Sequence, residues 1–224
     1  MILRIFKPSF WKILYRQRFL FLVLSLALIS FGLKTIFYDV QADYLQGDLV
    51  KILFIHVPFA WMSVLIYIAM SVSAFFCLIV KTPFAYRLML RLNPLGMLFT
   101  TLTLLTGSIW GKPAWGVWWV WDARLTSVLI LLFIYLGFHL LNKSLSHPER
   151  AHKIMSLYTL LGAINIPIIK FSVDWWNTLH QPSTITKNLS NHLHESYWLP
   201  LFLMFFGFVF WSLFLVLNRI NRHE

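Results

Sequence analysis

Tryptophan is concentrated in one short segment of the chain. Five of the eleven tryptophans fall within residues 110–122, which read WGKPAWGVWWVWD. Pro113 suits the first turn of a short helix, and such a helix would carry tryptophans at spacings i, i+3 and i+4 on one face: Trp115, Trp118 and Trp119. We expect a surface helix that presents a flat aromatic shelf to a planar ligand. The alternative is an aromatic belt, although a belt populates both membrane interfaces.

Charged residues border this aromatic segment. Asp122 directly precedes an apolar run and is well placed to cap the N-terminus of a helix that starts there. Arg124 and Lys112 are cations in a part of the chain that has few of them. Each can pair with a ligand carboxylate, with Asp122 or with a lipid headgroup, and the sequence leaves these alternatives open.

Two of the eight histidines are candidates for binding a metal. His56 lies about two turns into an apolar run, where an ionisable group indicates a functional site; backbone carbonyls freed by Pro58 are its alternative partner. His180 follows two tryptophans in DWWNTLHQP, residues 174–182. If this segment is helical, Trp176 and His180 share a face. Neutral imidazole is a good ligand for iron, so two imidazoles beside an aromatic shelf predict a haem site.

The composition of the chain indicates the class of protein in which these residues are positioned. Of 224 residues, 59% are hydrophobic and 12% charged, and the mean hydropathy is +0.71. Soluble domains are about 25% charged, so the chain is expected to be an integral membrane protein. A net charge of +11 on so apolar a chain does not favour nucleic-acid binding. Cys77 is the single cysteine, which excludes an intrachain disulfide and a CxxC pair.

Six apolar runs are long enough to predict membrane-crossing helices. They cover residues 19–37, 50–80, 95–109, 125–141, 154–171 and 197–217. We therefore expect an all-α membrane protein with six transmembrane helices in a single domain, residues 1–224, with no internal repeat. Residues 107–127 and 173–196 are expected to form its outer site.

The distribution of charge predicts the orientation in the membrane, because loops rich in Lys and Arg stay cytoplasmic. One side holds 13 Lys and Arg with two acidic residues, and the other holds six with six. Both termini are expected to be cytoplasmic. Eight tryptophans and the histidines at 56, 180, 192 and 194 then belong to the outer side. His192 and His194 lie in a polar stretch that favours solvation, and any role for them stays open.

Residues 107–127, GSIWGKPAWGVWWVWDARLTS, are similar to the WWD signature of haem-handling proteins. Together with ADYLQG at 42–47, HVP at 56–58, NIPII at 165–169 and DWWNTLHQPST at 174–184, this segment makes the chain closely resemble the bacterial haem exporter protein C family, also called cytochrome c maturation protein C. The resemblance implies a non-enzymatic protein that delivers haem at the periplasmic face of the inner membrane during c-type cytochrome biogenesis.

The resemblance also implies site residues and partners. His56 and His180 are the expected axial ligands of a transiently bound haem b. The residues expected to hold the porphyrin are Trp110, Trp115, Trp118, Trp119, Trp121, Asp122, Arg124, Trp175 and Trp176. The implied partners are an ABC-type complex of maturation proteins A and B, the small membrane protein D, and the haem chaperone, maturation protein E. The chain itself has no GxxxxGK[ST] nucleotide-binding motif.

Three alternatives remain from the sequence. A haem permease requires a broken helix near the bilayer midplane, for which Pro167 and the span between Gly96 and Gly107 are candidates. A b-type electron carrier requires a second histidine inside a span, where the sequence offers His139 near the opposite face. A purely structural subunit leaves the one-sided clustering of tryptophan and histidine unexplained. The chain lacks CxxCH, so it is not itself a c-type cytochrome.

Overall fold

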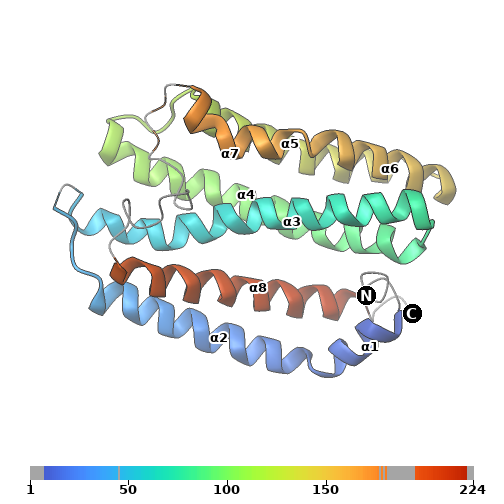
Figure 1. Ribbon diagram of the computed structural model, residues 1–224, viewed down its shortest axis with the longest axis horizontal. Helices are drawn as coiled ribbons and strands as arrows, with labels where there is room; N and C mark the ends of the chain where they lie inside the picture. The colour runs from blue at the N-terminus through green and yellow to red at the C-terminus, as the bar shows by residue number, and fades with distance from the viewer. Residues whose placement is uncertain (1–7, 45, 177, 179, 181–194, 221–224) are drawn as a thin grey trace.

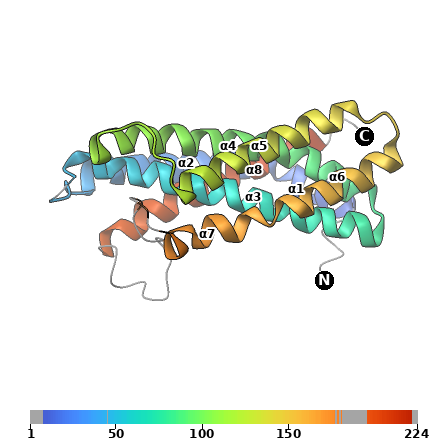
Figure 2. The same ribbon diagram turned by 90° about the horizontal axis from the view of Figure 1, so that it is seen from above.

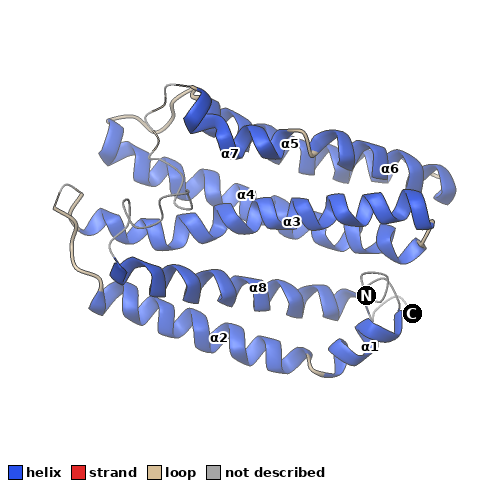
Figure 3. Cartoon of the chain, viewed as in Figure 1, coloured by secondary structure: helices blue, strands red, loops and turns tan. Residues whose placement is uncertain are grey.

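The computed structural model describes residues 8–44, 46–176, 178, 180 and 195–220, and the elements named within these ranges are all helices (Figure 3). Six segments are long and apolar enough to cross a membrane: Arg18–Asp39, Asp48–Val80, Pro83–Trp115, Ala123–Ser144, Pro148–Trp175 and Trp198–Arg219. The predicted all-helical fold with six spans is confirmed.

The helices follow one another with short connections. The first part of the chain forms α1 (Pro8–Arg16), α2 (Arg18–Lys34), the π-helical turn η2 (Thr35–Asp39), the 3₁₀ turn η3 (Asp48–Ile52) and α3 (Leu53–Val80). The second part forms α4 (Pro83–Trp115), α5 (Ala123–Ser144), α6 (Pro148–Gly162), α7 (Asn165–Trp175), the 3₁₀ turn η5 (Glu195–Tyr197) and α8 (Trp198–Ile220).

The third span is much longer than predicted. Helix α4 has 33 residues, whereas the continuous apolar run covers only residues 95–109. It begins with Pro83 at its first turn and continues through Pro94 and Pro113. It ends at Gly116, whose left-handed backbone (φ 79°) is a conformation that glycine adopts readily. The apolar run therefore identified only the middle of this helix.

The fifth span is two helices, with Pro167, the candidate break that the sequence offered, in the first turn of the second. Helix α6 ends at Gly162 and α7 begins at Asn165, so the break lies near the middle of the span. Pro167 explains its position, because proline has no N–H and its ring clashes with the carbonyl four residues earlier, here that of Ala163. The buried side chain of Asn165 donates a hydrogen bond of 2.8 Å to the Ser127 carbonyl and so ties α7 to α5.

The helices form three layers, with α2 and α8 on one side, α3 and α4 in the middle, and α5, α6 and α7 on the other side (Figure 1). Helix α3 is central, since it packs against α4, α6 and α8. Two buried tyrosines join the middle layer to the layer of α5, α6 and α7: Tyr67 donates to the Thr159 carbonyl (3.0 Å) and Tyr135 to the Ser63 carbonyl (2.7 Å).

The two ends of the bundle differ in what they carry. Helix α1 and the turns between α3 and α4 and between α5 and α6 lie at one end (Figures 1 and 2). The last turns of α4 and α7 and the start of α3 lie at the other end, together with the aromatic segment. The elements that carry His56 and His180 are thus brought to one end, as the sequence predicts; the side of the membrane that each end faces stays a prediction from charge.

Candidate functional site

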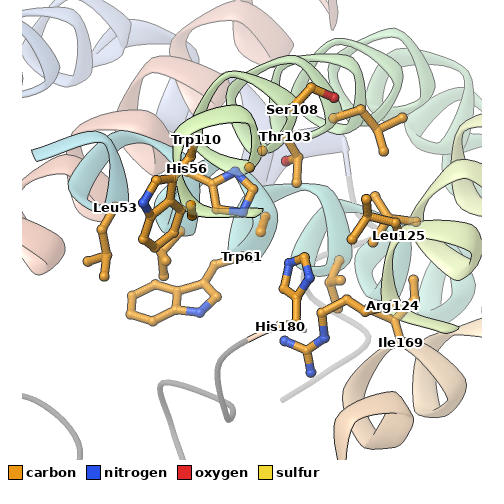
Figure 4. Close-up of a pocket in the computed structure, with 18 of the residues that line it drawn as sticks. Leu53, His56, Trp61, Thr103, Ser108, Trp110, Arg124, Leu125, Ile169 and His180 are labelled. Atoms are coloured by element: carbon orange, nitrogen blue, oxygen red, sulfur yellow. The ribbon is translucent and has the colours of Figure 1, made fainter. Parts of the chain in front are cut away.

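A cavity of about 810 Å³ opens at the aromatic end of the bundle. Its walls come from α3, α4, α5, α7 and α8, and its volume is in the range of small-molecule and cofactor sites. Both predicted metal ligands line it, His56 from α3 and His180 from the segment after α7, and Figure 4 shows both rings beside Trp61 and Arg124. The cavity thus joins residues more than 120 positions apart in the sequence.

His56 is held by a threonine of the neighbouring helix. Its Nδ1 lies 3.0 Å from Oγ1 of Thr106. The Thr106 hydroxyl already donates to the Leu102 carbonyl at 2.7 Å, so His56 Nδ1 is the donor and Thr106 the acceptor. The side-chain partner of His56 is thus Thr106, whereas the alternative that the sequence left open was a backbone carbonyl freed by Pro58. This arrangement leaves the lone pair of His56 Nε2 available for a metal.

Close packing around His56 fixes the plane of its ring. A Cβ atom at Gly107 would lie 3.0 Å from Cε1 of His56, so a larger residue at this position would push the ring away from α4 by a few tenths of an ångström. Trp110 packs edge-on against the ring, with centroids 5.8 Å apart. The Trp110 indole donates to Oε1 of Gln46 at 2.8 Å, which anchors the loop between η2 and η3 to the last turns of α4.

His180 is positioned by Asp122. Nδ1 of His180 lies 3.5 Å from Oδ2 of Asp122, a carboxylate whose side chain is only 5% exposed. The same oxygen accepts a short hydrogen bond from the Thr178 hydroxyl, which in turn accepts from the backbone N–H of His180 at 3.1 Å. The indole of Trp115 lies against the His180 ring, with centroids 5.1 Å apart.

The other carboxylate oxygen of Asp122 confirms the predicted helix cap. Oδ1 accepts a hydrogen bond of 2.7 Å from the N–H of Leu125 in the first turn of α5. Burial acts to raise the pKa of Asp122, but the facing His180 ring, the Thr178 hydroxyl and the Leu125 N–H outweigh it and lower the pKa to about 2. Asp122 is therefore a carboxylate at neutral pH that both starts α5 and holds His180.

The predicted surface helix with a tryptophan shelf is wrong. Helix α4 runs through Pro113 to Trp115, and the chain then bends and extends over residues 116–122. As a result the tryptophans separate: Trp110, Trp115 and Trp119 line the cavity, whereas Trp118 and Trp121 are 59% and 76% exposed. Lys112 donates to the Gly116 carbonyl at 2.8 Å, so it stabilises the end of α4.

The segment that carries Trp175, Trp176 and His180 does not form the single helix that would place Trp176 and His180 on one face. Helix α7 ends at Trp175, and Trp176 has an extended backbone, so Trp176 and His180 do not share a helix face. The side chains of Trp175 and Trp176 are more than half exposed, pack against each other, and are absent from the cavity wall. His192 and His194 lie outside the described residues, as does most of the predicted site segment 173–196.

Arg124 lines the cavity while bonding to α7. Its Nε donates to the Ser172 hydroxyl at 3.2 Å and its Nη2 to the Lys170 carbonyl at 3.4 Å. The guanidinium therefore joins the start of α5 to α7 and adds a positive charge to the wall. Among the alternatives that the sequence left open for Arg124, a ligand carboxylate stays compatible with this position.

Several residues of the site were missed from the sequence. Trp61 lies five residues after His56 on α3 and lines the same cavity, and Lys170 and Phe205 line it from α7 and α8. The hydroxyl of Thr106 gave no signal, because an apolar helix commonly contains threonines that bond to their own backbone. Thr106 can accept a hydrogen bond from His56 because α3 and α4 pack against each other in the folded protein.

The volume and the largely apolar, aromatic lining of the cavity are compatible with a flat, apolar ligand. Two imidazole nitrogens supply only two ligands, so a bound iron must bring further ligands in a plane, as a porphyrin does. Indole and aliphatic side chains cover the walls, and Arg124 lies near one histidine. The indole N–H of Trp119 is buried and has no hydrogen-bond partner in the part of the chain that the structure describes, so an acceptor on a ligand would satisfy it.

Comparison with known proteins agrees with this chemistry. The family model described as "Heme exporter protein C" matches residues 3–223. The chain belongs to the haem exporter protein C family. Named members of the family are similar over most of this chain. The Haemophilus influenzae protein is 41% identical over 200 residues, 89% of this chain and 81% of its own length.

Two further relatives carry the same name. The Escherichia coli K12 protein is 40% identical over 200 residues, which make up 89% of this chain and 80% of that protein. The Bradyrhizobium diazoefficiens protein is 49% identical over 166 residues, 74% of this chain. The match covers 63% of the Bradyrhizobium protein's own length.

Replacing Asp122 by asparagine tests the cap and its charge. The amide oxygen retains the cap of α5, but the charge that holds Thr178 and His180 is lost, so the free energy of unfolding should fall by about 2 kcal/mol at pH 6. The pKa of Asp122 is lowered from 3.8 to about 2. The stabilisation is therefore complete above pH 4 and is lost as the pH falls through that interval. Melting of the detergent-solubilised protein between pH 6 and pH 3 measures this.

The melting temperature of the parent should exceed that of Asp122→Asn at pH 6, and this difference in melting temperature should narrow below about pH 4. The control is Asp48→Asn, since the Asp48 side chain is 77% exposed and pairs with Lys51 on its own helical turn. Its melting should follow that of the parent throughout. If the melting temperatures of the parent and Asp122→Asn differ by a constant amount between pH 6 and pH 3, the ionised carboxylate does not stabilise the fold.

Proposed function

We propose that this protein binds haem b transiently between His56 and His180 and passes it on during c-type cytochrome biogenesis. The observation that carries the proposal is that two imidazoles from separate elements line one aromatic cavity, each with its Nδ1 facing an oxygen of the protein. Membership in a family named for haem export supports the same role. Haem supplies a planar iron centre with two open axial positions, and the protein supplies the axial ligands.

Each ligand is prepared by a different neighbour. Thr106 accepts the Nδ1 proton of His56, which directs the Nε2 lone pair of His56 towards the cavity. Asp122 faces Nδ1 of His180, and a carboxylate in that position raises the basicity of the imidazole and orients it. The guanidinium of Arg124 lies in the wall near His180, where it attracts the carboxylates of a porphyrin.

The two ligands differ in how firmly the fold holds them. His56 is fixed within the helix α3 and packed between Gly107 and Trp110. His180 follows the end of α7 and is held through Asp122 and Thr178. A carrier must let go of its ligand, and we propose that His180 leaves the iron first while His56 keeps its position.

The finer parts of the proposal concern location and partners. The site faces the periplasm from the bacterial inner membrane, because the opposite end of the bundle collects most of the Lys and Arg residues. The protein acts without catalysing a reaction, together with ABC-type maturation proteins A and B and the small protein D. It passes haem to the chaperone, maturation protein E.

One alternative function gains an observation from the structure. A permease requires a broken helix near the bilayer midplane, and the fifth span is broken between Gly162 and Asn165. The part of the chain that the structure describes gives no observation that favours a permanent b-type electron carrier. His139 of α5 does not line the cavity, and the second histidine comes from the segment after α7 instead of from within a span.

Removing either histidine tests the ligand assignment. His56→Ala and His180→Ala should each lose most of the haem that copurifies with the parent, or shift its visible spectrum to that of a single-imidazole haem. Haem content by the pyridine haemochrome assay and the absorption spectrum measure this. His139→Ala is the control and should resemble the parent. If both variants retain the parent spectrum and haem content, the assignment is wrong.

Thr106→Val tests the positioning of His56. Valine has nearly the shape of threonine but cannot accept the Nδ1 proton, so the haem affinity should fall about 10- to 100-fold, as for other partners of metal-bound histidines. Haem titration gives the dissociation constant. The control is Thr101→Val, which removes a similar hydroxyl that bonds to the Met97 carbonyl on the same helix. Equal affinities for the parent and Thr106→Val would contradict the role of Thr106.

A further inference from the structure

The polar groups of the cavity lie at one end only. His56, His180, Arg124 and Trp110 line the cavity at the end that carries the aromatic segment (Figure 4). Along α3 the wall continues from His56 to Ile68, about 18 Å at 1.5 Å per residue. Beyond His56 the α3 residues in this wall are all apolar, so the cavity becomes more apolar towards the middle of the bundle.

A second cavity of about 470 Å³ continues from this apolar end. Helix α3 lines it with Ile68, Ser71, Val72, Phe75 and Phe76, and the broken fifth span lines it with Ala163, Ile166 and Pro167. Ile68 and Ile166 belong to the walls of both cavities. The hydroxyl of Ser71 donates to the Tyr67 carbonyl at 2.9 Å, so its proton is not available to a ligand.

The break in the fifth span explains why this region is open. Helix α6 packs against α3, whereas α7 packs mainly against α5, where Asn165 bonds to the Ser127 carbonyl. The two halves of the span therefore diverge at residues 163–164, beside α3. Ile68 and Val72, which line the second cavity, are 44% and 46% exposed, so this cavity is accessible from the side of the bundle. Because the break lies near the middle of the apolar span, we expect the opening to face the bilayer interior.

We infer that haem enters the cavity sideways from the bilayer through this lateral opening, formed by Ile68, Val72, Ala163, Ile166 and Pro167. This inference rests on the proposed haem-binding function and specifies its route. The porphyrin ring is apolar and partitions into hydrocarbon, and most side chains along the path to the histidines are apolar. The carboxylates of the ligand then meet Arg124 at the polar end.

The test blocks the opening without touching the histidine cavity. Val72 and Ala163 line only the second cavity, from opposite walls, and either is replaced by tryptophan. The matched control is Val23→Trp, because Val23 is 61% exposed on α2 and lines neither cavity. The full-length proteins, free of haem, are placed in phospholipid nanodiscs. Haem is supplied either dissolved in the bilayer or in water as a complex with serum albumin.

The absorbance of bound haem gives the rate and the end point of loading. Val72→Trp and Ala163→Trp should load from the bilayer at least about tenfold more slowly than the parent, which corresponds to about 1.4 kcal/mol of barrier. Their final spectra and haem content should equal those of the parent, and Val23→Trp should load at the parent rate. Loading from albumin should be slowed less than loading from the bilayer.

Two results would overturn the lateral route. One is loading of both blocked variants from the bilayer at the parent rate. The other is an equal slowing from both haem sources with altered final spectra, which would show damage to the cavity instead of a blocked entrance. Both leave the haem-binding proposal standing. If the parent protein binds no haem at all, the proposed function fails, and that outcome is distinct.

Discussion

A polar group in the hydrocarbon layer must find its hydrogen-bond partner within the protein, and the site is built under this constraint. Along α4, four threonines, at positions 100, 101, 103 and 106, each donate to the carbonyl four residues earlier. Tyr67 and Tyr135 donate to carbonyls of neighbouring helices. Thr106 adds one function to this pattern, because a hydroxyl that has used its proton can still accept from His56. The hydrogen bond that satisfies the Thr106 hydroxyl within α4 therefore also leaves its oxygen free to orient the imidazole of His56.

Asp122 joins the folding of a helix to the geometry of the site. One oxygen caps α5, and the other holds Thr178 and faces His180. The segment after α7 and the start of α5 are therefore fixed by one carboxylate, and Arg124, two residues later, bonds to α7 from the same turn. Because α7 leaves α3 to reach these contacts, the arrangement that positions His180 is also the one that opens the bundle sideways.

Much of the fold follows from the sequence, and the failures have identifiable causes. Continuous apolar runs predict the six spans, and Asp122 before such a run predicts its cap. Pro113 was interpreted as the start of a new helix, but α4 passes through it, so the tryptophans after Gly116 do not form one helical face. Pro167 was a candidate break in the fifth span, and the span is interrupted just before it, since α6 ends at Gly162 and α7 begins at Asn165. Trp61 and Thr106 escaped notice because their roles depend on contacts between helices, which spacing along one helix cannot reveal.

The central claim is that two protein imidazoles, from α3 and from the segment after α7, bind one iron. The electron paramagnetic resonance spectrum of the protein loaded with ferric haem tests it most directly, with the histidines labelled with nitrogen-15. The account predicts a low-spin, six-coordinate iron with hyperfine coupling to two histidine nitrogens. A high-spin spectrum, or coupling to a single histidine nitrogen, would contradict it.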